Sequence, residues 1–225
     1  MMDNRCIIFP HIPKCGGSSL KSQLETSNLK VYFDYDWPPN NNKYFRKQCE
    51  RRNREASLLD FGGFDVVFGH FPAERYIRDN YRYVTLMRHP VDRAVSHYSY
   101  WKNVLPKSNA LALSRYPIIQ QIKQGKVGFL EFTKAQKLNG YYAMYLSRRL
   151  PQDFLLVGFL DEYASFLHQL SDILCVQFSP NVHFRQGMKE SIALEDRQKA
   201  EAFMAPEISC YEAFRDYWVT GMSRR

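Results

Sequence analysis

Residues 13–19 combine a lysine, a pair of glycines and two serines, in the order Pro13-Lys14-Cys15-Gly16-Gly17-Ser18-Ser19. Where glycines lie between a strand and a helix, backbone N–H groups can converge on a phosphate, and the helix N-terminus adds a partial positive charge. Lys14 precedes the glycines and no lysine follows directly, so the segment does not match the ATP-binding loop G-x-x-x-x-G-K-[ST]. The pattern predicts a P-loop-like phosphate-binding loop in which Lys14 stabilises leaving-group charge. A plain glycine turn with an exposed lysine is the alternative.

A second set of anion-binding candidates follows the apolar run at residues 83–87. Arg88 comes directly after this run, and Ser96 lies about two turns into the helix expected next. Arginine and hydroxyl groups both donate hydrogen bonds to phosphate oxygens, the arginine with charge assistance. Arg88 and Ser96 are therefore candidates for binding a second phosphate. The alternative is that Arg88 pairs with Asp92 and that Ser96 faces its own helix.

Short apolar runs alternate along the chain with segments of helical periodicity. We expect strands at residues 5–9, 31–35, 66–68, 83–87 and 154–157. We expect helices at residues 18–24, 43–54, 91–101, 116–124, 140–146, 160–174, 194–202 and 208–218. This alternation predicts an α/β fold, a three-layer sandwich with a central, mainly parallel sheet. Ligands of such sheets bind at the carboxyl ends of the strands, where both phosphate-binding candidates fall.

The length and composition are those of one globular domain, which we expect to span residues 1–225. Hydrophobic residues make up 45% of the chain and charged residues 24%, which excludes the disordered and fibrous classes. The net charge of +8 favours an anionic partner such as nucleotide phosphates, acidic sugars or nucleic acid. A basic solvated surface without such a partner explains the charge equally well.

The cysteines and the apolar stretches bear on the cellular compartment. The five cysteines are scattered and lack metal-ligand spacing, so we expect free thiols in a reducing compartment. No stretch reaches the roughly 20 apolar residues of a membrane span, and residues 1–8 lack the apolar core of a signal peptide. We expect a cytoplasmic protein if Met1 is the native start, and a Golgi-type luminal domain if an anchor has been removed.

Three segments resemble those of the sulfotransferases that use 3′-phosphoadenosine-5′-phosphosulfate (PAPS), most closely the carbohydrate branch that includes heparan sulfate 2-O-sulfotransferase. Residues 11–19 (HIPKCGGSS) are similar to the family's 5′-phosphosulfate loop, and residues 88–98 (RHPVDRAVSHY) to its 3′-phosphate segment. Residues 67–71 (VFGHF) are similar to a strand that ends in Gly-His and presents a catalytic base. Two residues depart from the pattern: Cys15 stands where threonine is usual, and His89 where aspartate or asparagine is common.

The resemblance implies an in-line displacement, in which an acceptor hydroxyl attacks the sulfur of PAPS and 3′-phosphoadenosine-5′-phosphate leaves. His70 would accept the hydroxyl proton as general base, and Lys14 would stabilise the departing phosphate oxygen. Arg185 and Lys189 would close over the nucleotide from a later loop. The implied acceptor is a hydroxyl group, with a carbohydrate favoured, and neither a metal ion nor nucleic acid is expected to take part. A structural histidine at the strand end is the alternative for His70.

Two other classes of function stay open. A nucleotide or sugar kinase would share the glycine loop, but it would need Mg²⁺ and a differently placed lysine. A non-catalytic module that binds glycans or nucleic acid would explain the net charge without a role for Lys14 or His70. The basic segment at residues 43–54 could steer an acidic glycan or form the solvated face of a helix. Tyr98, Tyr100 and Trp101 could stack on sugars, although such aromatic spacing is typical of a core.

Overall fold

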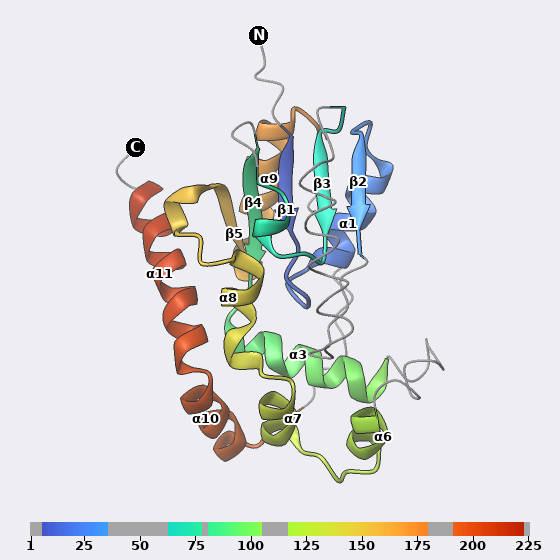
Figure 1. Ribbon diagram of the computed structural model, residues 1–225, viewed down its shortest axis with the longest axis vertical. Coiled ribbons are helices and arrows are strands. Elements are labelled where there is room, and N and C mark those ends of the chain that lie inside the picture. The colour runs from blue at the N-terminus through green and yellow to red at the C-terminus, as the bar shows by residue number, and fades with distance from the viewer. Residues whose placement is uncertain (1–5, 36–62, 78–80, 105–116, 180–190, 223–225) are drawn as a thin grey trace.

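The computed structural model describes residues 6–35, 63–77, 81–104, 117–179 and 191–222, and a five-stranded sheet lies at its centre (Figure 1). The strand order is β2-β3-β1-β4-β5, and every strand runs parallel to its neighbours. The strands are β1 (Ile7–Pro10), β2 (Val31–Asp34), β3 (Val66–Gly69), β4 (Arg82–Met87) and β5 (Phe154–Phe159). Each overlaps an apolar run from which a strand was predicted, and the predicted parallel sheet is confirmed.

Helices follow the strands and cover the sheet. The α-helices are α1 (Gly17–Thr26), α3 (Pro90–Asn103), α6 (Pro117–Lys123), α7 (Phe129–Ala135), α8 (Tyr141–Leu146), α9 (Tyr163–Leu174), α10 (Leu194–Phe203) and α11 (Ala205–Met222). The 3₁₀ helices are η1 (Ala73–Arg75), η2 (Leu138–Gly140), η3 (Pro151–Asp153) and η4 (Leu160–Glu162). The sequence pattern does not predict α7, and the helix predicted at residues 43–54 lies outside the described residues.

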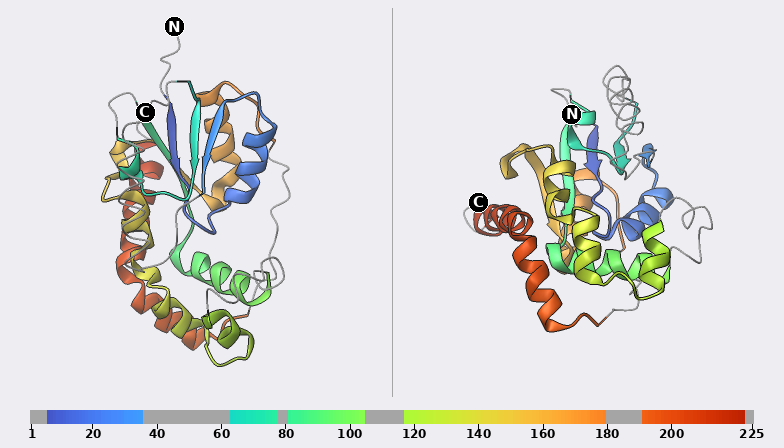
Figure 2. Two further views of the ribbon diagram at one scale, coloured as in Figure 1. Left: turned by 45° about the vertical axis from the view of Figure 1, so that its right-hand side comes forward. Right: turned by 60° about the horizontal axis from the view of Figure 1, so that its bottom comes forward.

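Side chains of successive strand residues enter two separate cores, one on each face of the sheet. Ile7 and Phe9 of β1 belong to the core beneath α1 and α9, whereas Ile8 belongs to the core beneath α3 and α8. This alternation follows from the two-residue period of a strand, which directs neighbouring side chains to opposite faces. Figure 2 (left) shows α1 and α9 on one side of the strands and α8 and α11 on the other. The three layers predicted from the sequence are therefore present.

The carboxyl ends of the strands point toward a second group of helices. Figure 1 shows α3, α6, α7 and α10 lying beyond this edge of the sheet. The turn after β4 leads directly into α3, whose first residue, Pro90, has no N–H to leave unpaired. The buried Thr85 hydroxyl donates to the Pro10 carbonyl at 3.1 Å and so ties the ends of β4 and β1 together. This edge fixes the positions of the loops that follow β1, β3 and β4.

Helix α9 shows how the outer layers are attached. Its buried residues, Tyr163, Phe166, Leu167 and Leu170, recur at the spacing of one helix face. The Phe166 ring is 1% exposed and meets the Phe9 ring of β1 edge to face, with centroids 6.1 Å apart. Aromatic contacts of this kind contribute both buried area and a favourable ring geometry.

We predict that Phe166→Ala lowers the free energy of unfolding by about 3–5 kcal/mol, because it leaves a cavity between α9 and the sheet. Urea unfolding followed by circular dichroism measures the change. The control is Leu194→Ala, since Leu194 is 71% exposed and its truncation should change stability by less than about 0.5 kcal/mol. Equal effects of the two substitutions would contradict this packing.

Candidate functional site

Three loops meet at the carboxyl edge of the sheet, because β3, β1 and β4 are parallel neighbours. His70 follows β3, His11 follows β1 and Arg88 follows β4. The His11 N–H donates to the Gly69 carbonyl at 2.7 Å. Arg88 donates from Nη1 to the Lys14 carbonyl at 3.4 Å. The structure therefore places three residues from separate sequence motifs, His70, Lys14 and Arg88, along one edge.

The loop between β1 and α1 has a backbone suited to binding an anion. Lys14 and Gly16 have φ angles of 72° and 80°, in the left-handed region. A Cβ at residue 17 would lie 1.8 Å from the His11 ring, so only glycine leaves room for that ring. The N–H groups of Gly17 and Ser18 have no acceptor among the residues that the structure describes. The first turn of α1 thus offers free donors and the positive end of a helix dipole.

Lys14 and Arg88 are half-buried cations that lie beside each other. The Lys14 ammonium lies 4.2 Å from the centre of the Tyr100 ring. Burial, and then the charge of Arg88, lower the pKa of Lys14 to about 8. Within the described ranges, no carboxylate forms an ion pair with either cation; Asp92, four residues after Arg88, instead pairs with Arg197 at 2.8 Å. Two adjacent cations that no described carboxylate neutralises make this place attractive to an anion.

A cleft of about 290 Å³ opens next to Arg88. Its lining comes from the ends of β4 and β5 and from α3 and α11, and consists of Arg88, His89, Asp92, Leu160, Asp161 and Tyr211. The His89 ring meets the Tyr211 ring edge to face at 5.6 Å. Ser96 is half-buried on α3, and its hydroxyl has no hydrogen-bond partner in the described part of the chain. Arg88 therefore borders an open space, as a ligand-binding residue must.

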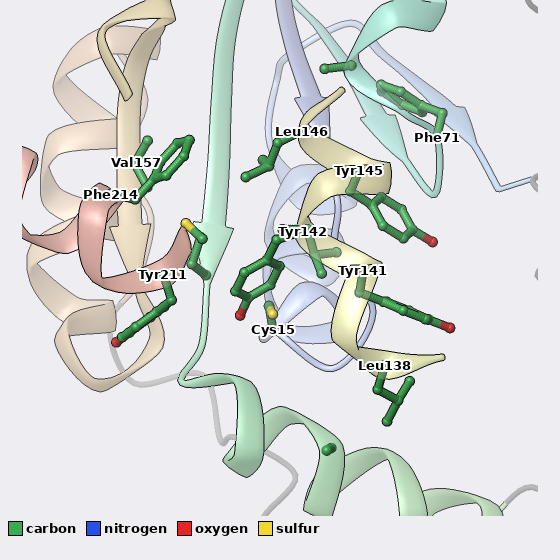
Figure 3. Packing of buried hydrophobic residues seen from close by; sticks show 14 of the residues in the cluster. Cys15, Phe71, Leu138, Tyr141, Tyr142, Tyr145, Leu146, Val157, Tyr211 and Phe214 are labelled. Carbon is green, nitrogen blue, oxygen red and sulfur yellow. The ribbon is translucent and has the colours of Figure 1, made fainter. Parts of the chain in front are cut away.

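Cys15 anchors the loop to the core. Its side chain is 0% exposed and lies close to the Tyr142 ring (Figure 3). Burial raises the pKa of the thiol to about 11, although Arg93, Arg88 and a hydrogen bond with Tyr142 act in the opposite direction. The Cys15 N–H donates to the Ile12 carbonyl at 3.3 Å. A protonated, buried thiol packs as a small apolar side chain, so cysteine can occupy this position.

His70 sits at the end of β3 with its ring between two others. Its ring centroid is 4.8 Å from that of His11 and 4.8 Å from that of Tyr35. The buried Nε2 of His70 has no hydrogen-bond partner among the described residues. Burial lowers the pKa of His70 to about 4, an effect that the nearby Asp34 carboxylate only partly offsets. The imidazole is therefore neutral at neutral pH and has a lone pair available to accept a proton.

His11 lies deeper in the site than its sequence position suggests. The ring is 6% exposed, stacks on Phe68 at 5.2 Å, and fills the space beside Gly17. Neither ring nitrogen has a partner in the described ranges, and burial, reinforced by the nearby His70 and Lys14, keeps the pKa of His11 well below the ordinary value. His11 thus forms a neutral wall between the phosphate-loop candidate and His70.

Sequence reasoning did not single out three buried polar residues behind the site: Arg93, Tyr142 and Glu207. Arg93 and Glu207 form an ion pair at 3.4 Å, and their side chains are 0% and 2% exposed. Burial raises the pKa of Glu207 to about 7, although the Arg93 charge lowers it. The sequence signal that could have identified this group is the position of Arg93 among the apolar residues of a predicted helix, because a buried charge needs a partner.

Several sequence candidates fall elsewhere. Arg185, Lys189 and the basic segment at residues 43–54 lie outside the described residues. Tyr98 and Trp101 belong to the buried core, and Tyr100 contacts Lys14. In the ranges that the structure covers, there is no cluster of three or more metal-ligating side chains. The helices seen there are all too short or too polar to cross a membrane.

The chain is similar to known sulfotransferases. A family model described as "Sulfotransferase family" matches residues 1–202. Among solved structures, the chain is similar to a sulfotransferase from Alicyclobacillus acidocaldarius, with 18% identity, a TM-score of 0.48, and coverage of 93% of this chain and 94% of that chain. It is also similar to a mouse sulfotransferase complexed with PAP, with 11% identity, a TM-score of 0.46, and coverage of 98% of this chain and 89% of that chain. No curated protein matches the chain.

We predict that Lys14→Met makes the protein more stable at neutral pH, by on the order of 1 kcal/mol once solvent screening is allowed for. The substitution removes a desolvated charge that Arg88 repels, and the thioether can still contact the Tyr100 ring. Urea unfolding measures the change, with Lys30→Met as the control because Lys30 is exposed.

The pH dependence gives a second check on the same variant. The pKa of Lys14 is about 8 in the folded protein and 10.5 ordinarily, so the unfolded chain binds more protons between these values. Stability contributed by Lys14 should therefore rise with pH across this window. The wild type should gain stability relative to Lys14→Met between about pH 8 and pH 10.5, and a constant difference would contradict the lowered pKa.

Proposed function

The chain belongs to the sulfotransferase family, and we propose that it transfers a sulfuryl group from PAPS to a hydroxyl group of a carbohydrate, with His70 as general base and Lys14 at the leaving group. The sulfotransferase class follows from the family match over residues 1–202. The observation that carries the site assignment is the contact between Arg88 and the Lys14 carbonyl at 3.4 Å. Lys14 and Arg88, neither of which pairs with a carboxylate of the described residues, follow neighbouring strands, and this arrangement supports a ligand with two phosphate positions.

The residues at this edge fit the nucleotide donor. Free N–H groups at Gly17 and Ser18, together with the hydroxyls of Ser18 and Ser19, suit a 5′-phosphosulfate. Arg88 and Ser96 suit a 3′-phosphate, and the cleft beside Arg88 adjoins them. We retain Pro13, Cys15 and Gly16 as residues that shape the loop, and Arg185 and Lys189 as predicted ligands from a later loop. When bound, PAPS supplies the sulfuryl group and a phosphate leaving group.

Lys14 has two tasks in this scheme. Its ammonium attracts the anionic donor, and it stabilises the negative charge that develops on the phosphate oxygen as the sulfur–oxygen bond breaks. A pKa of about 8 leaves most of the side chain protonated at neutral pH. A bound anion favours the charged form further and raises that pKa. The donor therefore strengthens the cation on which the transfer depends.

His70 accepts the proton of the acceptor hydroxyl while the new oxygen–sulfur bond forms. With a pKa of about 4, the free ring is neutral and ready to accept a proton, although it is a weak base. An anionic group bound next to His70 stabilises the imidazolium and raises its pKa toward the range useful for catalysis. The Asp34 carboxylate nearby acts in the same direction. His70 should thus become a stronger base once the donor is in place.

Nucleotide binding and transfer test the proposal directly. We expect 3′,5′-ADP, at about 100 times its Kd, to raise the melting temperature by about 5–10 °C, and ATP with Mg²⁺ to leave it almost unchanged. Labelled PAPS, incubated with a panel of polysaccharides, lipids and small alcohols, should label a polysaccharide. Stabilisation by ATP with Mg²⁺ alone would favour a kinase. Labelling only of a non-carbohydrate would remove the carbohydrate acceptor and keep the sulfotransferase.

We predict that His70→Ala lowers kcat/KM for transfer by about 10²–10⁴-fold, because the hydroxyl loses its proton acceptor. The Kd for 3′,5′-ADP, measured by calorimetry, should stay within about twofold of the wild type. His168→Ala is the matched control, since His168 is exposed on α9, away from the strand ends. Unchanged transfer in His70→Ala would remove His70 as the base.

A further inference from the structure

The hydroxyl of Tyr142 lies between the two segments that bear the proposed phosphate ligands. Tyr142 belongs to α8, and its side chain is 0% exposed. Figure 3 shows its ring pointing from α8 toward the end of β4, with Cys15 just beneath it. Tyr142 therefore reaches both phosphate-binding segments from a helix that belongs to neither of them.

The Tyr142 side chain contacts both segments. It accepts a hydrogen bond from the Arg88 N–H at 3.2 Å and donates to the Arg88 carbonyl. The Tyr142 ring also packs beside the buried Cys15 side chain, two residues before the glycine at which α1 begins (Figure 3). One side chain thus joins the backbone at the end of β4, through its hydroxyl, to the loop after β1, through the packing of its ring.

Tyr142 is itself held in place from behind. Its N–H donates to Glu207 Oε1 at 2.9 Å, and the Arg93 guanidinium lies 5.5 Å from its ring centre. Arg93 pairs with Glu207 at 3.4 Å and donates to the Leu138 carbonyl at 3.3 Å. Moving Tyr142 would disturb a buried ion pair, which is costly because the charges have no water to replace the partner. Glu207 lies beyond residues 1–202, the part matched by the family model.

We propose that Tyr142 is a positioning residue that fixes the spacing between the Lys14 loop and Arg88, so that both bind the phosphates of one nucleotide at once. The inference rests on the proposed donor. Two contacts to one ligand reinforce each other only when their spacing matches that ligand in advance, since otherwise binding must order the protein. A ligand with one phosphate needs no such match. The role of Tyr142 should therefore show itself with bisphosphates alone.

The test compares Tyr142→Phe with Tyr145→Phe. Tyr145 lies one turn later on α8 and is 3% exposed, so each variant removes one hydroxyl from a buried ring of the same helix. Calorimetry measures the Kd of 3′,5′-ADP, 5′-AMP and 3′-AMP for both variants and the wild type. For Tyr142→Phe, we expect the Kd of 3′,5′-ADP to rise about five- to tenfold, the worth of one hydrogen bond. The Kd values of the two monophosphates should change by less than about twofold. Tyr145→Phe should leave the Kd values of all three nucleotides unchanged.

Transfer kinetics give an independent readout. Tyr142→Phe should raise the KM for PAPS and leave both the acceptor KM and kcat at saturating donor close to the wild type. If Tyr142→Phe does not fold, Cys15→Ala replaces it, because it removes the loop side chain that packs beside the Tyr142 ring and should show the same bisphosphate-specific loss.

The outcomes separate this inference from the proposed function. Equal losses for all three nucleotides, or no loss for 3′,5′-ADP, would overturn the spacing role. A loss for 3′-AMP alone would show that Tyr142 supports Arg88 and does not set a spacing. Failure of the wild type to bind 3′,5′-ADP would refute the proposed donor, and this inference with it.

Discussion

Repulsion between two cations that have been partly removed from water is the constraint around which this molecule is built. Lys14 and Arg88 come from loops 74 positions apart in the chain, yet Arg88 donates to the Lys14 carbonyl. Charges in such a place destabilise the fold unless an anion accompanies them. The parallel pairing of β1 with β4 brings the two loops together, and buried hydrogen bonds keep them from separating. The cost in stability falls at the edge where we propose that the donor binds, and perturbed charged groups are common at functional sites.

The polar residues buried behind this edge are unusual in being connected to one another. Arg93, Glu207 and Tyr142 come from α3, α11 and α8, and each contacts at least one of the others. A network of this kind specifies one arrangement of helices, because every member left without its partner would be a buried unsatisfied group. The helices beyond the sheet therefore do more than cover the core. Through the Tyr142 hydroxyl, they also hold the backbone of Arg88 in place.

The sequence predicts the sheet well because its evidence is local. Compact apolar runs and glycine or proline turns mark all five strands, and the glycine loop and Arg88 follow two of them. Helix α7 escapes prediction because its short buried face consists of Phe129, Phe132 and the polar Thr133, so its apolar period is weak. The support from Tyr142 is equally hidden, since a hydroxyl that meets the backbone of a residue 54 positions away leaves no local pattern. A single sequence therefore gives no indication of long-range polar contacts.

The closeness of His11 and Gly17 has a consequence for how such loops can diverge. The imidazole occupies the volume that any larger residue at position 17 would need, because a Cβ there would lie 1.8 Å from the ring. Neither position can therefore change freely while the other is kept: a bulkier residue at 17 demands a smaller one at 11. Relatives that differ at one of these two places should carry a compensating difference at the other, so the pair is expected to co-vary across evolution.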